Sequence, residues 1–389
     1  MSTLDKKEKE FSLVNKKLIL RRQSNIELLR IISMILIVSH HFSLHGVLKN
    51  FGENALLQQS VTTILAQIIQ LGGKVGVCLF ILISGYFMVN AEVKLKKIFF
   101  LVLQVLFYSI GSLCFIKLLG ATIELTDIIE AVFPVLHEQY WFVTAYVILY
   151  LISPFLNKLL LNLSKKEFQK MLLVTIFLWI LVPTFTSGEM GSSNITRFIL
   201  FYSIGSFIKL HSNKKYDNIK FGFILSLISY SLLVASVFIY NFIGRKLQIN
   251  ELISEATYFS NSSSLLVLAI AVGLFIWIKN INMGSINWIN KVSGATFGIY
   301  LIHDNRHIRP ILWHSIFRTQ EHISDSPLFF VLYALYVVLV VLFVTIGIEL
   351  LRLKYIHKYE VKILDVFLNH EYLKIITALK SIKFIKKIK

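Results

Sequence analysis

The sequence predicts an all-α membrane protein, a polytopic bundle of about ten membrane-spanning helices. Hydrophobic residues make up 56% of its 389 residues, charged residues only 16%, and the mean hydropathy is +0.68. Apolar runs of about twenty residues recur along the chain, which is the length that a helix needs to cross a bilayer. The segments of roughly ten alternating residues that mark a transmembrane β-barrel are not visible. Composition and run length therefore agree on one fold class.

Candidate spans are separated by charged residues or by breaks that contain Gly, Asn or Ser. They cover residues 26–46, 62–89, 97–119, 140–161, 169–186, 195–210, 219–242, 261–279, 291–318 and 327–351. The second and the ninth are longer than a bilayer requires, so we expect them to be kinked or broken. No internal repeat and no linker rich in proline or serine divides the chain, so we expect the spans to form one domain, residues 26–351.

Basic segments flank this domain. Residues 1–25 form a Lys-rich leader that we expect in the cytoplasm. The apolar run that follows is too long for a signal-peptide core and lacks a small-residue cleavage pattern, so it should remain as the first helix. Residues 352–389 form a basic tail, in which LKIITALKSIKFIKKIK predicts an amphipathic helix on the inner leaflet.

Basic residues concentrate in alternate connections. The leader, the connections near 90–97, 158–170, 209–220 and 279–291, and the tail hold 30 of the 40 Lys and Arg residues. By the positive-inside rule, both termini are cytoplasmic. The opposite connections carry acidic residues, among them Glu124, Asp127, Glu130, Glu138, Glu321 and Asp325. The net charge of +18 then reflects this bias and attraction to anionic lipid, and does not indicate a nucleic-acid partner.

The cysteines offer no chemistry of their own. Cys78 and Cys114 both fall within predicted spans, and they form no disulfide framework, metal-ligand spacing or nucleophile motif. We expect them to be small packing residues, and we expect no metal cofactor.

Arg30 and His41 stand out, because an ionisable side chain at membrane depth costs roughly 2.5–3.5 kcal/mol on insertion scales and is by default a functional candidate. They are eleven residues apart, which brings them within about 20° of the same helix face and roughly 16 Å apart along the axis. We expect His40, about 100° away, to face elsewhere, and His45 to lie one turn beyond His41. An alternative for Arg30 is a residue at the membrane edge that pairs with Glu27.

Four stretches then occur in a characteristic order. NIELLRIISMILIVSHH contains Arg30 and His41, and the others are LFILISGYFM (79–88), YWFVTAYVILYLISPFLN (140–157) and SGATFGIYLIH (293–303). From about residue 24 to 350 the chain resembles the integral-membrane acyltransferase family 3. Members of this family modify cell-surface polysaccharides, peptidoglycan or other carbohydrates, and their first-helix signature is an Arg followed after ten residues by His.

The resemblance implies an O-acyltransferase, in the first place an O-acetyltransferase, that uses cytosolic acyl-CoA and acts on an exported or lipid-linked polysaccharide. Arg30, Lys96 and Lys97 would bind the CoA phosphates, and the thioester would reach His41. Many relatives have paired arginines after the second span, whereas this chain has KLKK (94–97), so these lysines would act as point charges. His41 would serve either as a general base or as an acyl carrier.

The ninth span carries a second polar cluster at similar depth. His303 lies about 18 Å above Lys291 along a helix, and the residues that follow toward the exterior are Asp304, Arg306, His307 and Arg309. We expect His303 and these charges to orient the acceptor or to stabilise the oxyanion of the thioester. An alternative is a collar of interfacial arginines that pair with Glu138 or Asp325.

Two further features lie at or within the membrane. Tyr140 and Trp141, where the fourth span begins, suit an aromatic belt, and beside a glycan site they also suit a sugar-binding platform. Lys74, within LGGKVG, should lie near mid-membrane and needs a partner or water. The sequence suggests no specific role for it.

Two other functions stay open. Intramembrane charges also suit a transporter or flippase for a glycan or small anion, although no inverted repeat is visible. A scaffold in a polysaccharide-synthesis complex would leave His41 without a chemical role. Motifs of soluble acyltransferases are absent, since HHFSLHG has His45 where the HHxxxDG pattern has Asp. The composition, rich in Lys, Ile and Asn, suggests the plasma membrane of a bacterium with an AT-rich genome.

Overall fold

The computed structural model describes residues 23–92, 94–186 and 188–366. All regular secondary structure in these ranges is helical, which confirms the all-α prediction. Most of the leader and the amphipathic segment predicted at the end of the tail lie outside the described residues.

Eight helical segments of the described chain are long and apolar enough to cross a membrane. They are Ser24–Val47, Val61–Met88, Leu95–Leu118, Trp141–Asn162, Lys165–Thr186, Ile219–Leu247, Asn250–Lys279 and Pro327–Tyr355. The two other predicted spans do not meet these criteria. Residues 195–210 lie in one helix, α10 (Asn194–His211), and residues 291–318 are divided among several short helices. The count of about ten spans therefore stays a prediction.

Helix α2 (Ser24–His41) continues into a π-helical turn, η1 (Phe42–Val47), and the second span is broken as expected. Its two parts, α3 (Val61–Gln70) and α4 (Gly73–Met88), meet at a pair of glycines. A Cβ on Gly73 would lie 2.2 Å from Cγ of His40, and one on Gly76 would lie 2.4 Å from the carbonyl oxygen of Ser33. Glycine is therefore required for α4 to approach α2 this closely.

The middle of the chain supplies the next helices. They are η2 (Phe51–Asn54), α5 (Leu95–Leu118), α6 (Leu125–Val132), α7 (Trp141–Asn162), α8 (Lys165–Ile176), η3 (Phe177–Leu181), α9 (Val182–Thr186), α10, α11 (Ile219–Leu247), α12 (Asn250–Ser254), η4 (Tyr258–Ser260) and α13 (Leu265–Lys279). Polar side chains cap several of them. Ser164 accepts a hydrogen bond from the backbone N–H of Glu167, and Ser193 does the same for Thr196.

The predicted ninth span is the most fragmented part of the fold. It contains α14 (Asn287–Ser293), α15 (Thr296–His303), α16 (Ile308–Pro310) and η5 (Ile311–Ile316), and it is followed by η6 (Thr319–Ser324) and the long α17 (Pro327–Tyr355). The break after His303 takes Asp304 out of the helix while keeping both side chains buried. A polar cluster can therefore form at this point.

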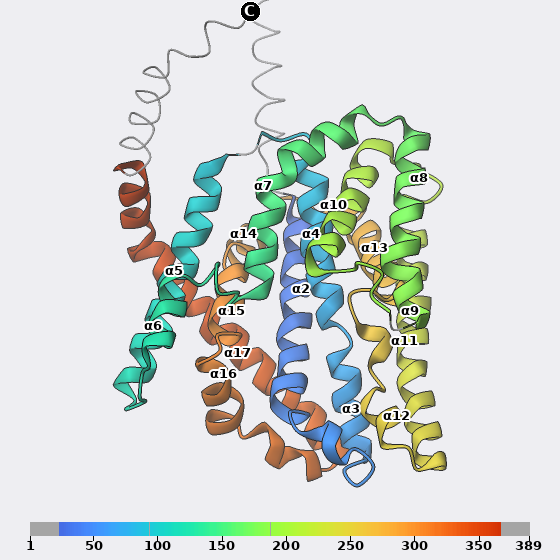
Figure 1. Cartoon of the computed structure of the whole chain (residues 1–389), viewed down its shortest axis with the longest axis vertical. Helices are drawn as coiled ribbons and strands as arrows, with labels where there is room; N and C mark the ends of the chain where they lie inside the picture. The colour runs from blue at the N-terminus through green and yellow to red at the C-terminus, as the bar shows by residue number, and fades with distance from the viewer. Residues whose placement is uncertain (1–22, 93, 187, 367–389) are drawn as a thin grey trace, which may run out of the picture.

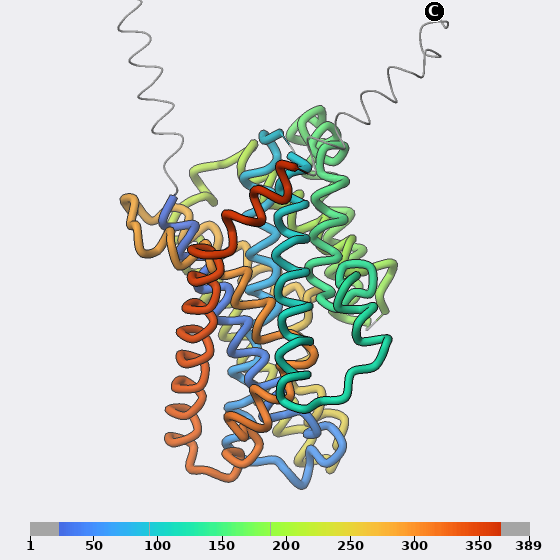
Figure 2. Tube along the Cα trace, turned by 90° about the vertical axis from the view of Figure 1, so that its left-hand side faces the viewer, coloured from blue at the N-terminus to red at the C-terminus, as the bar shows by residue number. Residues whose placement is uncertain are grey.

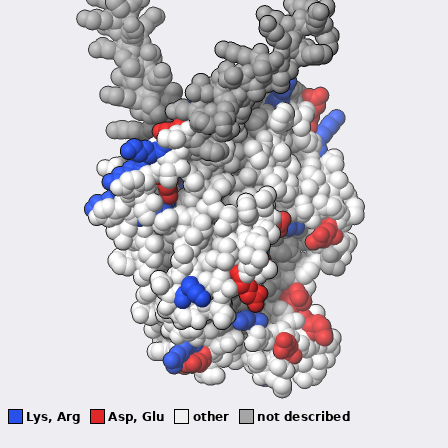
Figure 3. Space-filling model, turned by 60° about the vertical axis from the view of Figure 1, so that its left-hand side comes forward, with Lys and Arg blue, Asp and Glu red and all other residues white. Residues whose placement is uncertain are grey.

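Helix α2 lies at the centre of the arrangement (Figure 1) and contacts α3, α4, α13, α14, α15 and α17. Outer helices such as α11 and α17 leave large apolar side chains exposed, for example Phe242 and Phe343. On the face shown in Figure 3 most of the surface is uncharged, with basic side chains most numerous at the upper left and acidic ones in the lower right. This distribution is typical of a protein surrounded by lipid.

Both ends of the described chain lie toward the same end of the molecule (Figures 1 and 2), and α6 lies toward the other. From the sorting of basic residues we expect that same end to be cytoplasmic. In a variant that lacks Cys78 and Cys114, Leu125→Cys should react with an impermeant maleimide in intact cells, whereas Ser381→Cys should react only after lysis. Labelling of Ser381→Cys in intact cells would contradict the predicted topology.

Candidate active site

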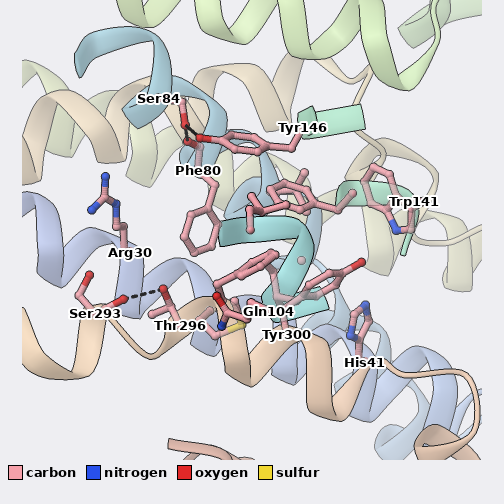
Figure 4. Close-up of a pocket in the computed structure, with 18 of the residues that line it drawn as sticks. Arg30, His41, Phe80, Ser84, Gln104, Trp141, Tyr146, Ser293, Thr296 and Tyr300 are labelled. Carbon is pink, nitrogen blue, oxygen red and sulfur yellow. Dashed lines mark hydrogen bonds between the residues drawn. The ribbon is translucent and has the colours of Figure 1, made fainter. Parts of the chain in front are cut away.

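A cavity of about 400 Å³ lies inside the bundle, between α2, α4, α5, α7, α14 and α15. Figure 4 shows Arg30 and Ser293 at one end, His41 and Trp141 at the other, and Gln104 and Tyr300 between them. Because α2 is continuous from Ser24 to His41, Arg30 and His41 line the same cavity at a separation of roughly 16 Å. A smaller cavity of about 250 Å³ shares Arg30 and Lys97 with the first, and so adjoins its Arg30 end.

His41 belongs to a chain of hydrogen bonds that fixes its tautomer when both rings are neutral. Nδ1 of His303 lies 2.6 Å from the carbonyl oxygen of Ile299, which can only accept, so this nitrogen carries the proton. Nε2 of His303 then accepts a hydrogen bond from Nδ1 of His41, 2.9 Å away. Nε2 of His41 is left with its lone pair, and it makes no hydrogen bond to any described residue. An imidazole held in this way is suited to accept a proton.

Charged groups lie beside this histidine pair. Oδ1 of Asp304 is 3.6 Å from Nδ1 of His41, 3.8 Å from Nε2 of His45 and 3.3 Å from Nε of Arg309. Asp304 is buried, and its carboxylate would stabilise the positive charge that His41 gains on protonation. The structure therefore brings His41 together with His303, Asp304 and Arg309, which lie more than 260 positions later in the sequence.

The spacing in this cluster also fits a metal ion, because one ligand atom each from His41, His45 and Asp304 lies within 4.8 Å of the others. However, Nδ1 of His41 is already bonded to His303, and Asp304 lies against the Arg309 guanidinium. We therefore interpret the cluster as a hydrogen-bonded base, and the expectation that no metal is used stays a prediction.

The expectation that His40 faces away from this region is wrong. His40 also lines the cavity, because Gly73, at the break between α3 and α4, leaves room for its ring. Its Nδ1 lies 2.8 Å from the carbonyl oxygen of Gln70. His40 thus ties α2 to α3, and it lacks the carboxylate that lies beside His41.

At the other end, Arg30 pairs with Glu27, as the alternative interpretation proposed. Nη1 of Arg30 lies 3.0 Å from both carboxylate oxygens of Glu27, whose carboxylate also accepts a hydrogen bond from Ser293. The pairing does not remove Arg30 from the cavity, because its Nε and Nη2 groups make no hydrogen bond to a described residue and the side chain is 32% exposed. Arg30 can therefore still bind an anion.

The two lysines of KLKK that were predicted to bind CoA lie in different surroundings. Lys97 lines both cavities. Lys96 does not line either, and its half-exposed side chain pairs with Asp365, with 2.6 Å between Nζ and Oδ1. The structure thus brings Lys97 to the Arg30 end and leaves Lys96 at the surface.

Trp141 and Tyr140, the two aromatic residues at the start of α7, also differ in their surroundings. Trp141 lines the cavity. Tyr140 is 1% exposed, and its hydroxyl donates to the carbonyl oxygen of Leu301 at 2.9 Å and accepts from Nδ2 of Asn305 at 2.7 Å. In this structure Tyr140 connects α7 to α15 and offers no surface to a sugar.

Arg306 pairs with two acidic residues of α6, Asp127 and Glu130, and not with Glu138 or Asp325 as the collar interpretation proposed. Asp127 also accepts a hydrogen bond from the backbone N–H of Glu124. This bond and the Arg306 guanidinium hold the pKa of the Asp127 carboxyl below its usual value. Arg306 therefore links α6 to the break in the ninth span.

Gln104 is a cavity residue that was not predicted from the sequence. Its Nε2 donates to Oε1 of Glu349 at 3.1 Å, so its carbonyl oxygen is free to accept a hydrogen bond from a ligand. Glu349 is fully buried and also binds Tyr108 and Arg352. The pair Glu349 and Arg352, three residues apart near the end of an apolar span, is the sequence signal that could have indicated this network.

The family model of the acyltransferase domain, from the acyltransferase 3 family, matches residues 23–346. Neither a curated protein nor a solved structure matches the chain. The matched range contains the cavity and the histidine pair. The chain therefore belongs to the acyltransferase 3 family and is a membrane acyltransferase.

Proposed function

We propose that the protein transfers an acyl group, in the first place acetyl, from cytosolic acyl-CoA to a hydroxyl of a cell-surface or lipid-linked polysaccharide. The observation that carries this proposal is one cavity that joins cationic groups at one end to an oriented, unbonded imidazole nitrogen at the other. A soluble donor and an exported acceptor need such a path across the membrane. The polar cluster of the ninth span lies at the His41 end.

The cavity suits the donor in three ways. Arg30 and Lys97 supply positive charge where the CoA phosphates would lie. The distance of roughly 16 Å from Arg30 to His41 is of the order of an extended pantetheine arm. Between them, the carbonyl oxygen of Gln104 can accept a hydrogen bond from a pantetheine amide.

The chemistry follows from the tautomer of His41. Its Nε2 removes the proton of the acceptor hydroxyl as the oxygen attacks the thioester carbonyl, and Asp304 and His303 stabilise the imidazolium that forms. The same nitrogen can instead attack the thioester and carry the acyl group before transfer. Rapid acid quench with radiolabelled acetyl-CoA separates the two routes, because only the second labels the protein.

The direct test is the acetate content of the host's surface polysaccharide with and without the protein. We expect ester-linked acetate to disappear when the gene is deleted and to return with the wild-type chain. Unchanged acetate, together with no transfer of propionyl or succinyl groups by purified protein, would contradict the proposal.

A transporter or flippase is the second candidate, since the ninth span is broken beside a polar cavity, as helices at transport sites often are. Purified protein in liposomes distinguishes the two. An acyltransferase releases CoA thiol from acetyl-CoA in the presence of acceptor glycan, whereas a transporter moves glycan without releasing thiol.

Arg30→Lys should raise the KM for acetyl-CoA by about tenfold and leave kcat nearly unchanged. The lysine keeps the charge but loses the guanidinium donors that can bind a phosphate in a bidentate manner. The measurement is steady-state CoA release by the purified protein. The matched control is Arg245→Lys, because Arg245 is an exposed arginine of α11. An unchanged KM would favour a purely structural pairing of Arg30 with Glu27.

A further inference from the structure

Lys74 is a buried cation for which the functions described so far give no role. It lies in the first turn of α4 and lines the cavity together with Trp141 and His41. Its Nζ lies 5.0 Å from the centroid of the Trp141 ring. Among the described residues, no carboxylate lies within 4.0 Å of it, and Asp304 pairs with Arg309 instead.

A lysine in such surroundings needs a counter-charge. A cation–π contact compensates only part of the free energy lost when an ammonium group leaves water. The N-terminus of α4 has no side-chain cap and adds partial positive charge at the same place. A protonated Lys74 is thus only partly compensated by the protein at the His41 end of the cavity, which favours a negative charge supplied by the bound reactants.

We propose that Lys74 stabilises the oxyanion that forms on the thioester carbonyl during acyl transfer. This inference rests on the proposed function and extends it. The acceptor oxygen bonds to the carbonyl carbon as its proton passes to Nε2 of His41, and the carbonyl electron pair moves to the oxygen beside the Lys74 ammonium. The oxyanion then reforms the carbonyl, the C–S bond breaks, and the CoA thiolate takes the proton back from His41.

The Lys74 ammonium is expected to stabilise the transition state more than the bound donor. The ground-state thioester carries no charge on its carbonyl oxygen, so Lys74 gains most of its interaction energy as the charge develops. Donor affinity, by contrast, comes from the Arg30 end of the cavity. Removing Lys74 should therefore lower kcat and leave CoA binding almost unchanged.

The experiment compares Lys74→Met and Lys74→Arg in the purified full-length protein, with acetyl-CoA as donor and the host's surface polysaccharide as acceptor. We expect Lys74→Met to lower kcat by about 10²–10³, with the Kd for CoA within about twofold, and Lys74→Arg to retain most of the activity. The control is Lys117→Met, because Lys117 is an exposed lysine of α5. A kcat for Lys74→Met within about threefold of wild type would overturn the inference. A raised KM for acetyl-CoA with an unchanged kcat would also overturn it.

A rescue experiment covers the case in which Lys74→Met does not fold. Added ethylammonium should restore part of the activity of Lys74→Ala, and ethanol, its neutral analogue, should not. No rescue in a folded Lys74→Ala protein would overturn the inference. The inference would also be overturned if Lys74→Ala lost succinyl transfer but kept acetyl transfer, because Lys74 would then bind the carboxylate of the succinyl group. If wild-type protein transfers no acyl group, it is the proposed function that fails.

Discussion

His41→Ala is expected to lower the rate of acyl transfer by about 10²–10⁴, the usual contribution of a positioned general base. Alanine removes the nitrogen that is proposed to take the proton of the acceptor and leaves the Arg30 end of the cavity intact. The measurement is single-turnover transfer from acetyl-CoA to the glycan, in protein whose membrane expression equals that of wild type. CoA binding should persist, since Arg30 and Lys97 are unchanged.

His40→Ala is the matched control, because this neighbouring histidine also lines the cavity. It bonds to a backbone carbonyl and lacks the pairing with His303 and Asp304. We expect it to lower stability and to retain turnover within about tenfold of wild type. If His40→Ala abolishes transfer while His41→Ala does not, the base is His40. If neither variant affects transfer, the transporter or scaffold interpretation is favoured.

Arg352→Met is expected to destabilise the folded protein by about 3–5 kcal/mol, because it leaves two buried carboxylates without their cation. The Arg352 side chain is 4% exposed, and its guanidinium binds both carboxylate oxygens of Glu349 and both of Glu360, at distances of 2.6–2.9 Å. Thermal unfolding in detergent measures the effect. The triple variant Arg352→Met, Glu349→Gln, Glu360→Gln should recover much of the loss.

Lys96→Met provides the comparison, since it removes an ion pair in which both side chains are about half exposed. Such pairs contribute about 0–1 kcal/mol. If Arg352→Met lowers the melting temperature no more than Lys96→Met, the buried network does not stabilise the fold.

Helical periodicity predicted part of the candidate site. Arg30 and His41 line one cavity because α2 is continuous between them, so their spacing in sequence converts directly into position. Periodicity did not predict the position of His40, since it indicates the direction of a side chain but not where a neighbouring helix leaves space. That space depends on Gly73, which belongs to a different helix.

Contacts between distant segments could not be predicted in this way. The sequence indicated His303 and Asp304 as functional, but not that His303 would determine the tautomer of His41. Lys96 and Lys97 are adjacent and chemically identical, and only the direction of α5 separates a surface ion pair from a cavity residue. Gln104 was overlooked because a neutral amide in an apolar span carries no charge signal.

The hydrogen bond between His41 and His303 joins residues 262 positions apart, which has a consequence for biosynthesis. Membrane helices enter the bilayer in the order in which they are translated. Most of the chain must therefore be synthesised before the segment with His303 can contact the first helix. Until then His41 has neither a fixed tautomer nor a neighbouring carboxylate. A ribosome-bound or truncated chain would therefore lack the oriented base on which the proposed acyl transfer depends, and activity would begin only when synthesis of the domain is nearly complete.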